Sequence, residues 1–300
     1  QTHDNITCNR LTCLDIDGTI PLSFLLAMNS KPWPIDMTHD EYHSLSAIGR
    51  SALITFGQSP AHFWHQFLNP QAQSKAPTPA MLFGAAFHAY VLEPLEYKLK
   101  YVEAPAASKV SKAYRQAEEQ ALADGQTLLP LGTNAQCHQL SLALQDHPMA
   151  HKILSAKGFK EATYLATCPE TDLEVKCRAD CITDSGWVVD LKTTQNASPD
   201  AFTKTIANYQ YHVQAGFYLD VIEWATGTRP KGFLFICVEK EAPNAVSVIR
   251  ASDSMIEAGS RRARDLLNRM AYCFKTLGPK QPWPAYSHDI VEVNLPAWAS

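Results

Sequence analysis

The chain has 300 residues and a mass of 33.3 kDa, enough for one large domain with an extensive buried core. Hydrophobic residues make up 46% of the sequence and charged residues 19%, which excludes a disordered or fibrous protein. The formal net charge is −4. Bulk positive charge therefore cannot attract a nucleic acid, although local basic patches could still bind one.

The eight cysteines are scattered and form no Cys-x-x-Cys pair. This pattern indicates buried thiols in a reducing compartment and predicts no iron–sulphur cluster. The longest apolar run near the N-terminus, from Pro21 to Met28, is too short to cross a membrane. We therefore expect a soluble, cytoplasmic protein with no membrane partner.

Residues 1–36 differ in character from the rest and are interpreted as a leader of uncertain role, followed by one domain over residues 37–300. The pattern from residue 45 to about residue 156 is helical. Pro residues at first helical positions and a following Pro94 help to place the helix ends. The expected helices span Pro60–Phe67, Pro79–Leu92, Lys112–Asp124 and Thr133–Asp146.

Beyond residue 158 the pattern changes to strands separated by turn sequences. Three strands are expected in succession, then a helix, two more strands and a final helix. This order predicts an α/β fold with a mixed central sheet flanked by helices. The strands are Phe159–Thr167, Leu173–Ile182, Trp187–Thr193, Gly232–Val238 and Ala245–Arg250, and the helices are Ala207–Thr226 and Asp253–Leu277.

The second and third strands form a hairpin that is symmetric about Ser185. Asp180 and Asp190 are therefore expected to face one another, with Cα atoms about 4.5 to 5.5 Å apart. Because side chains alternate along a strand, Asp190 and Lys192 lie on one face. One face of the hairpin is predicted to be core and the other charged.

Two neighbouring carboxylates repel unless a positive charge lies between them. Oxygen ligands with an open face suit Mg²⁺ or Mn²⁺, which keeps several waters. Lys192 is placed to activate a water or to offset negative charge on a phosphate. The alternative is a solvated strand face that carries an Asp-x-Lys tripeptide by chance.

Several residues elsewhere extend this charged set. Gly84 and His88 share one face of an apolar helix, where the missing Cβ would let the helix approach the sheet. Glu161 lies on the strand beside Asp180. Gln214 and Tyr218 are one helical turn apart. Taken singly, these residues also suit a core histidine, a surface acid and ordinary helix packing.

The ordered set resembles the PD-(D/E)xK nuclease domain of exodeoxyribonuclease VIII (RecE) proteins of prophage recombination systems. The likeness runs from about Met37 to Trp298. It is carried by Gly84-Ala-Ala-Phe-His88, Glu161, Arg178-Ala-Asp180, Asp190-Leu-Lys192, Tyr211-His-Val-Gln214 and Tyr218. The family pattern has Pro before the first Asp, where this chain has Ala179; because Asp180 is retained, we expect this to affect strand geometry rather than chemistry.

The resemblance implies a restriction-endonuclease-like core and a metal-dependent exonuclease that degrades double-stranded DNA from 5′ ends. The 3′ single-stranded tails would serve a RecT-type annealing protein in recombination, and the chain would form a homo-oligomeric ring. By resemblance, the metal ligands are His88, Asp180, Asp190 and the Leu191 carbonyl. Lys192 activates the attacking water, and Glu161 either supports the metal site from outside or binds a second metal. Gln214 and Tyr218 support the active-site face and the substrate backbone.

Two basic stretches are candidates for contacts with the DNA backbone. Residues 260–280 hold six basic residues and one acid, and residues 98–115 hold five and one. A solvated helix face is the alternative for both. Arg50, at a helix start, is a candidate pocket for a terminal 5′ phosphate. The predicted substrate-binding residues are Arg50, Lys109, Lys112, Arg178, Tyr211, Gln214, Tyr218, Arg261 and Arg262.

Three other classes of function are alternatives: a phosphatase, another nuclease, of which an iron–sulphur nuclease is one kind, and a DNA-binding module. The segment Leu14-Asp-Ile-Asp-Gly-Thr-Ile20 matches the nucleophile motif of haloacid-dehalogenase-type phosphatases, with Asp15 as nucleophile, but no suitable acidic pair follows it. A RecB-like nuclease of different polarity stays open. An iron–sulphur nuclease would need four cysteines around the nuclease motifs. A catalytically silent DNA-binding module is disfavoured by the intact Asp180, Asp190 and Lys192.

Overall fold

We describe the fold from a computed structural model, which describes residues 33–72 and 76–295. The first half is mainly helical, as expected, and includes two short strands that pair in parallel. Its elements are α2 (His39–Ser44), α3 (Arg50–Gln58), α4 (Pro60–Phe63), the π-helix η1 (Trp64–Leu68), α5 (Pro79–Leu92), α6 (Pro94–Lys100), β1 (Tyr101–Glu103), α7 (Lys112–Ala123), β2 (Thr127–Leu129), α8 (Thr133–Asp146) and α9 (Pro148–Leu154).

The second half builds a five-stranded sheet in the order β3-β4-β5-β6-β7. β3, β4 and β5 form an antiparallel meander, β6 pairs with β5 in parallel, and β7 is antiparallel to β6. The parallel step requires a crossover, which two helices provide. The elements are β3 (Gly158–Thr167), β4 (Glu174–Thr183), β5 (Trp187–Thr194), α10 (Pro199–Asn208), α11 (Tyr211–Thr226), β6 (Gly232–Glu239), β7 (Val246–Arg250) and α12 (Asp253–Leu277).

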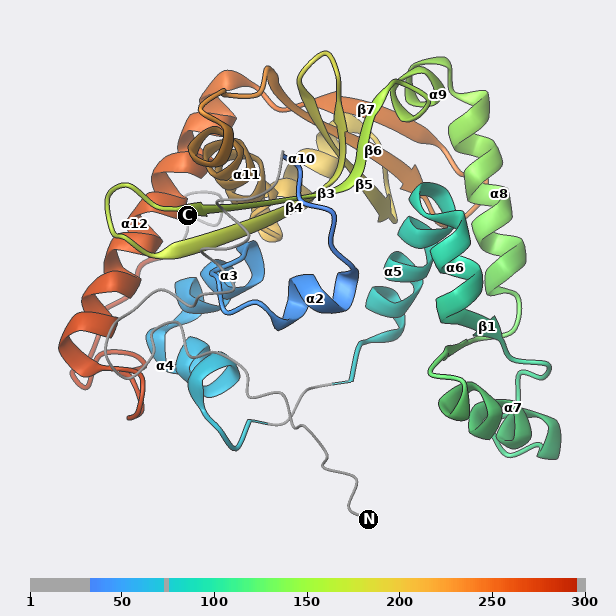
Figure 1. Ribbon diagram of the computed structural model, residues 1–300, viewed down its shortest axis with the longest axis horizontal. Coiled ribbons are helices and arrows are strands. Elements are labelled where there is room, and N and C mark those ends of the chain that lie inside the picture. Colours follow the sequence, from blue (N-terminus) through green and yellow to red (C-terminus); the bar gives the residue numbers. More distant parts are fainter. Residues whose placement is uncertain (1–32, 73–75, 296–300) are drawn as a thin grey trace.

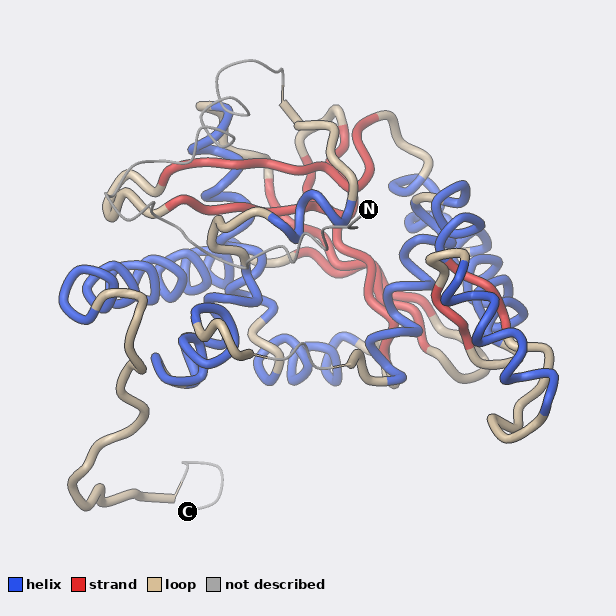
Figure 2. The backbone as a smooth tube through the Cα atoms, turned by 60° about the horizontal axis from the view of Figure 1, so that its bottom comes forward, coloured by secondary structure: helices blue, strands red, loops and turns tan. Residues whose placement is uncertain are grey.

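Helices cover the sheet with two separate hydrophobic cores. The larger core joins the sheet to α3, α4, α10, α11 and α12. The smaller core joins it to α5, α8 and α9 through residues such as Phe87, Leu140 and Ala150. Figures 1 and 2 show the strands between these two groups of helices. The predicted α/β architecture with a mixed central sheet flanked by helices is confirmed.

Local sequence signals fix the helix starts. Ser59 Oγ accepts a hydrogen bond from the amide of His62, and Pro60 occupies the first helical position. Thr78 caps α5 in the same way, ahead of Pro79. The predicted ranges of α5, α8 and α12 therefore agree with the structure.

Two elements differ from the expectations. The expected helix from Ala207 is two helices, because Gln210 has a left-handed backbone (φ 52°) that ends one helix and begins the next. The strands β1 and β2 lie in a region that was expected to be wholly helical. Three residues are too few to display the alternation that identifies a strand.

The long helices α11 and α12 cross at close range. A Cβ atom added at Gly259 would lie 1.8 Å from the backbone oxygen of His212, and one at Gly216 would lie 2.2 Å from the amide nitrogen of Ser260. Only glycine allows the two backbones to approach this closely. The crossing fixes α11, which carries residues that support the charged face of the sheet.

A residue just upstream of the predicted boundary at residue 37 also packs against the sheet. The Ile35 amide donates to the carbonyl of Thr163 on β3, and the Ile35 side chain is buried. The phosphatase-like segment around Asp15 lies outside the described residues. Among the described residues, none of the helices combines the length and the apolar character needed to span a bilayer.

Candidate active site

The β4–β5 hairpin opens where the charged residues begin. Cys181 pairs with Val189 and Ile182 with Val188, which is the register expected for a hairpin symmetric about Ser185. One step further the ladder stops. There the amide of Leu191 donates to Asp180 Oδ2 at 2.7 Å, instead of to a backbone carbonyl. The Asp180 carboxylate thus takes the place of a ladder acceptor and is held beside Asp190.

The charged face of the hairpin is not a solvated surface. Asp190 is 2% exposed and Lys176 is 8% exposed. Both line a cleft of about 710 Å³ that α2 and α3 border on the side opposite the strands. The alternative of a chance Asp-x-Lys on a solvated strand is therefore wrong, because burying these charges costs free energy unless they have partners or a ligand.

Asp190 is held from two sides. Gln214 Nε2, on α11, donates to its Oδ1 at 2.6 Å, and Lys192 Nζ lies 2.5 Å from its Oδ2. Among the described residues, that Oδ2 has no partner with the direction of a hydrogen bond, although it is buried. A carboxylate oxygen has two lone pairs, so this oxygen can contact a further cation besides Lys192.

His88, Glu161 and Asp180 form a group that can hold a metal ion. Their ligand atoms all lie within 4.8 Å of one another, and His88 Nδ1 is 3.3 Å from Asp180 Oδ2. Two carboxylates and one imidazole fit a divalent cation. Glu161 belongs to this group directly, whereas the resemblance gave it a supporting or second-metal role.

The expectation for Gly84 is wrong. A Cβ at this position would meet nothing within 4 Å, so the glycine does not mark a close approach of α5 to the sheet. His88 reaches the site from the same helix without it, through its contact with Asp180.

Glu161 has an unusual backbone. Lys160 pairs with Cys181 and Ala162 with Ala179, so Glu161 stands opposite Asp180 but outside the ladder. Its φ of 48° lies in the left-handed region, which a non-glycine residue on a strand rarely adopts. Such strain persists only where surrounding contacts hold it, and it often marks functional positions.

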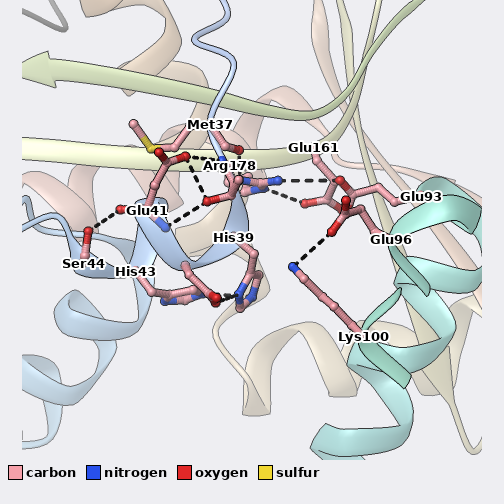
Figure 3. Close-up of polar contacts among 12 residues, drawn as sticks. Met37, His39, Glu41, His43, Ser44, Glu93, Glu96, Lys100, Glu161 and Arg178 are labelled. Atoms are coloured by element: carbon pink, nitrogen blue, oxygen red, sulfur yellow. Dashed lines mark hydrogen bonds and ion pairs between the residues drawn. The ribbon is translucent and has the colours of Figure 1, made fainter. Parts of the chain in front are cut away.

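Arg178 supplies those contacts. Its Nε donates to Glu161 Oε2 at 2.8 Å, its Nη1 donates to the Met37 carbonyl at 2.9 Å, and its Nη2 lies 3.8 Å from Glu93 Oε1. Figure 3 shows Arg178 between these groups. The side chain is only 9% exposed. Arg178 lines the cleft and also fixes Glu161, and its contact with substrate stays a prediction.

Burial and mutual repulsion perturb the site's acids. Burial, reinforced by Asp180 and opposed by Arg178, raises the pKa of Glu161 to about 8. Burial also raises the pKa of Asp180. For Lys192, burial lowers the pKa, but Asp190 and Asp180 more than offset this and the net pKa is raised. Lys192 is thus a cation here, suited to offset negative charge, and it would have to lose a proton before acting as a base.

Two cations of the cleft lie close to the ring of Tyr211, which is not itself part of the cleft lining. Lys192 Nζ lies 4.9 Å from the ring centre of Tyr211, and the Arg50 guanidinium lies 5.4 Å from the same ring. Arg50 Nη2 donates to the Tyr209 carbonyl at 2.5 Å, while its buried Nε has no hydrogen-bond partner in the part of the chain that the structure describes. Arg50, Gln214 and Tyr218 all line the cleft. The structure therefore brings them together with Asp180, Asp190 and Lys192.

The remaining predicted DNA contacts lie away from the cleft. In the described structure its lining includes none of Lys109, Lys112, Arg261 and Arg262. Arg261 pairs with Glu257 at 3.5 Å and Arg262 with Asp265 at 3.0 Å. Arg264 pairs with Asp220 at 3.2 Å, outside the stretch, whereas Arg269 lies 3.8 Å from Asp265, the acid that Arg262 already contacts.

The second wall of the cleft, formed by α2 and α3, was not predicted from the sequence. Lys176 donates to the carbonyls of Tyr42 and Leu45 at 2.7 and 2.8 Å and so fixes the end of α2 against β4. Lys176 shares the strand face of Asp180, which was a usable signal. No local pattern joins residues so far apart in the chain.

Comparison with known proteins gives the following. Residues 49–291 match the model of a family described as a PDDEXK-like domain of unknown function (DUF3799). A crystal structure from Eubacterium rectale, described as a "putative exonuclease", is 12% identical with a TM-score of 0.60, covering 88% of this chain and 98% of that one. A structure of SSO0001 is 13% identical over 61% of this chain and 84% of that one, with a TM-score of 0.28. No curated protein is significantly similar.

Proposed function

We propose a function from the premise that the chain belongs to the family of PDDEXK-like domains of unknown function (DUF3799), whose model spans residues 49–291. The proposal is that the protein is a metal-dependent nuclease that hydrolyses DNA phosphodiester bonds. One observation carries it: a buried charged face on which Asp180, Asp190 and Lys192 meet at the opened end of a hairpin. That arrangement places acids and a cation where a phosphate can reach them.

His88, Glu161 and Asp180 would hold the divalent cation, Mg²⁺ with Mn²⁺ as an alternative, and Asp190 and the Leu191 carbonyl stay predicted ligands beside them. When bound, the cation supplies a Lewis acid that polarises the phosphoryl group and lowers the pKa of water. Lys192 offsets negative charge that develops on the phosphate. Asp190 orients Lys192, and Gln214 fixes Asp190 through its hydrogen bond.

We further propose, along the resemblance to RecE proteins, that the substrate is an end of double-stranded DNA. Degradation would run 5′ to 3′ and leave 3′ single-stranded tails for a RecT-type annealing protein, in the cytoplasm and from a homo-oligomeric ring. Arg50 supports the recognition of an end, because its cationic side chain lines the cleft and its buried Nε finds no hydrogen-bond partner within residues 33–72 and 76–295. A terminal 5′ phosphate is the anion that such a group would bind.

Polarity is tested with one linear duplex carrying a label at either the 5′ or the 3′ end. Early release of the 5′ label with Mg²⁺ is the expected result, and early release of the 3′ label would replace the proposal with a nuclease of the opposite polarity. Substrates with 5′-phosphate and 5′-hydroxyl ends are then compared. Arg50→Gln should remove a preference for the phosphate, while Arg250→Gln, on β7, should leave it unchanged.

A further inference from the structure

A pair of histidines borders the cleft on α2, separate from the acidic group. His39 and His43 are one helical turn apart, and their Nε2 atoms lie 3.1 Å from each other. Figure 3 shows the two rings side by side on this helix. Both residues line the cleft. The proposed function uses neither of them.

The distance between the two nitrogen atoms suits joint coordination of one ion. Zinc–imidazole bonds of about 2.0 to 2.1 Å place two neighbouring ligand nitrogens roughly 3 Å apart. Histidines four residues apart on a helix face the same way and can chelate one metal. Imidazole nitrogen favours Zn²⁺, Cu²⁺ and Ni²⁺, whereas Mg²⁺ prefers oxygen.

The helix holds the pair in place from both ends. At its start, Thr38 and Glu41 form a reciprocal capping box. At its end, Lys176 donates to the carbonyls of Tyr42 and Leu45. A six-residue helix alone would be marginal, so these contacts explain how its two rings keep a fixed spacing. A site formed before the metal arrives loses less entropy on binding.

The surroundings favour neutral rings with an available lone pair. Asp40 Oδ1 lies 3.6 Å from His39 Nδ1, the place of the carboxylate that commonly orients a metal-binding histidine from its other nitrogen. Burial, aided by His39 and nearby cations, lowers the pKa of His43 to about 4. Of the cations near the two rings, Lys100 pairs with Glu96 at 3.5 Å, Arg178 pairs with Glu161, and Lys176 donates to the carbonyls of Tyr42 and Leu45. Their charges therefore oppose a bound cation less than their number suggests.

We propose that His39 and His43 form a second metal site at the rim of the cleft, selective for borderline transition-metal ions such as Ni²⁺ and Zn²⁺. Water completes the coordination. The cleft then carries two chemically different sites, an oxygen-rich one on the sheet and a nitrogen-only one on α2. The proposal does not depend on nuclease activity.

The test is Ni²⁺ titration of the purified protein by calorimetry in excess Mg²⁺, which competes at the oxygen-rich site. Wild type should bind one Ni²⁺ at the histidine pair. The double variant His39→Gln, His43→Gln should bind this Ni²⁺ at least roughly 100-fold more weakly. His88→Gln should retain it. Circular dichroism checks that the double variant keeps its fold.

A matched control exists on α9. His147 and His151 have the same spacing, but His147 is the N-cap residue and its Nδ1 accepts a hydrogen bond from the Ala150 amide. His151→Gln should leave Ni²⁺ binding unchanged. The proposal is overturned if the double variant binds Ni²⁺ as wild type does, or if His151→Gln weakens binding as much as the double variant.

Discussion

The cleft and the outer face of α12 both carry many charges but hold them differently. In the cleft, Asp190 is 2% exposed and lies beside Asp180, another acid. On α12, the side chain of Arg261 is 72% exposed, and each arginine has an acid within one helical turn or on a neighbouring element. Water screens the second set, whereas burial strengthens interactions within the first. Charge density along the sequence therefore does not locate the site; buried acids that repel one another do.

Replacing the buried cation should have the largest effect. Lys192→Ala should lower the rate of DNA hydrolysis by about 100-fold or more, because it removes the charge that offsets the phosphate. The measurement is the initial rate on linear duplex DNA with Mg²⁺. Lys204→Ala, on the exposed part of α10, is the control. Equal rates for Lys192→Ala and wild type would place the chemistry elsewhere.

A substitution on the inner face of α12, where it packs against α11, should lower the unfolding free energy far more than one on its outer face. Gly259→Ala would push a methyl group against the His212 carbonyl, so the two helices must separate and we expect a loss of about 3 kcal/mol in unfolding free energy. Chemical denaturation measures it. A loss of less than about 0.5 kcal/mol, the range of ordinary surface substitutions, would contradict the close crossing.

Replacing Arg178 tests whether a buried cation that contacts Glu161 is needed for metal binding. Arg178→Gln should weaken Mn²⁺ binding roughly 10- to 100-fold, as removal of a group that orients a metal ligand commonly does. Arg178→Lys should recover only part of the lost Mn²⁺ affinity, since a lysine cannot contact both Glu161 and the Met37 carbonyl as the forked guanidinium does. Arg229→Gln, which removes a pair with Asp220, is the control. Unchanged Mn²⁺ affinity in Arg178→Gln would make its contact with Glu161 incidental.

Glu174 gives a pH test on the same strand, away from the metal group. Both its carboxylate oxygens are buried without partners among the described residues, and burial raises its pKa to about 7. The folded state therefore keeps a proton that the unfolded state loses above about pH 4.5. Unfolding free energy should fall between about pH 4.5 and pH 7, by on the order of 1–3 kcal/mol.

Glu174→Gln should remove the part of this pH dependence that Glu174 contributes, because the amide does not ionise, while Glu161 and Asp180, whose pKa values are also raised, keep the remainder. Denaturation at a series of pH values measures it for both proteins. If the wild type and the variant show the same slope over that range, Glu174 is not the group responsible.

The smallest effect is expected on the outer face of α12. The double variant Arg261→Gln, Arg262→Gln should change unfolding free energy by less than about 0.5 kcal/mol and alter DNA affinity little. Binding measured against salt concentration tests this: each lost phosphate contact would reduce the slope of log affinity against log salt by about 1. A reduction of that size would return α12 to the DNA interface.

Much of the fold could be predicted, because long helices and strands carry periodic patterns and clear end signals. The hairpin register followed from the turn at Ser185, and it placed Asp180 near Asp190. The sequence could not show that Arg178 is engaged by Glu161 and by the Met37 carbonyl. It also could not show that α2 borders the cleft, since tertiary contacts alone bring these segments together.

The central claim is that the buried face of the hairpin hydrolyses DNA with a divalent cation. The most direct measurement is digestion of linear duplex DNA by wild type, Asp190→Ala and Asp15→Asn, each with Mg²⁺ and with EDTA. Wild type and Asp15→Asn should digest the DNA in Mg²⁺ only, and a folded Asp190→Ala should not digest it. Digestion by Asp190→Ala, digestion in EDTA, or loss of activity in Asp15→Asn alone would contradict it.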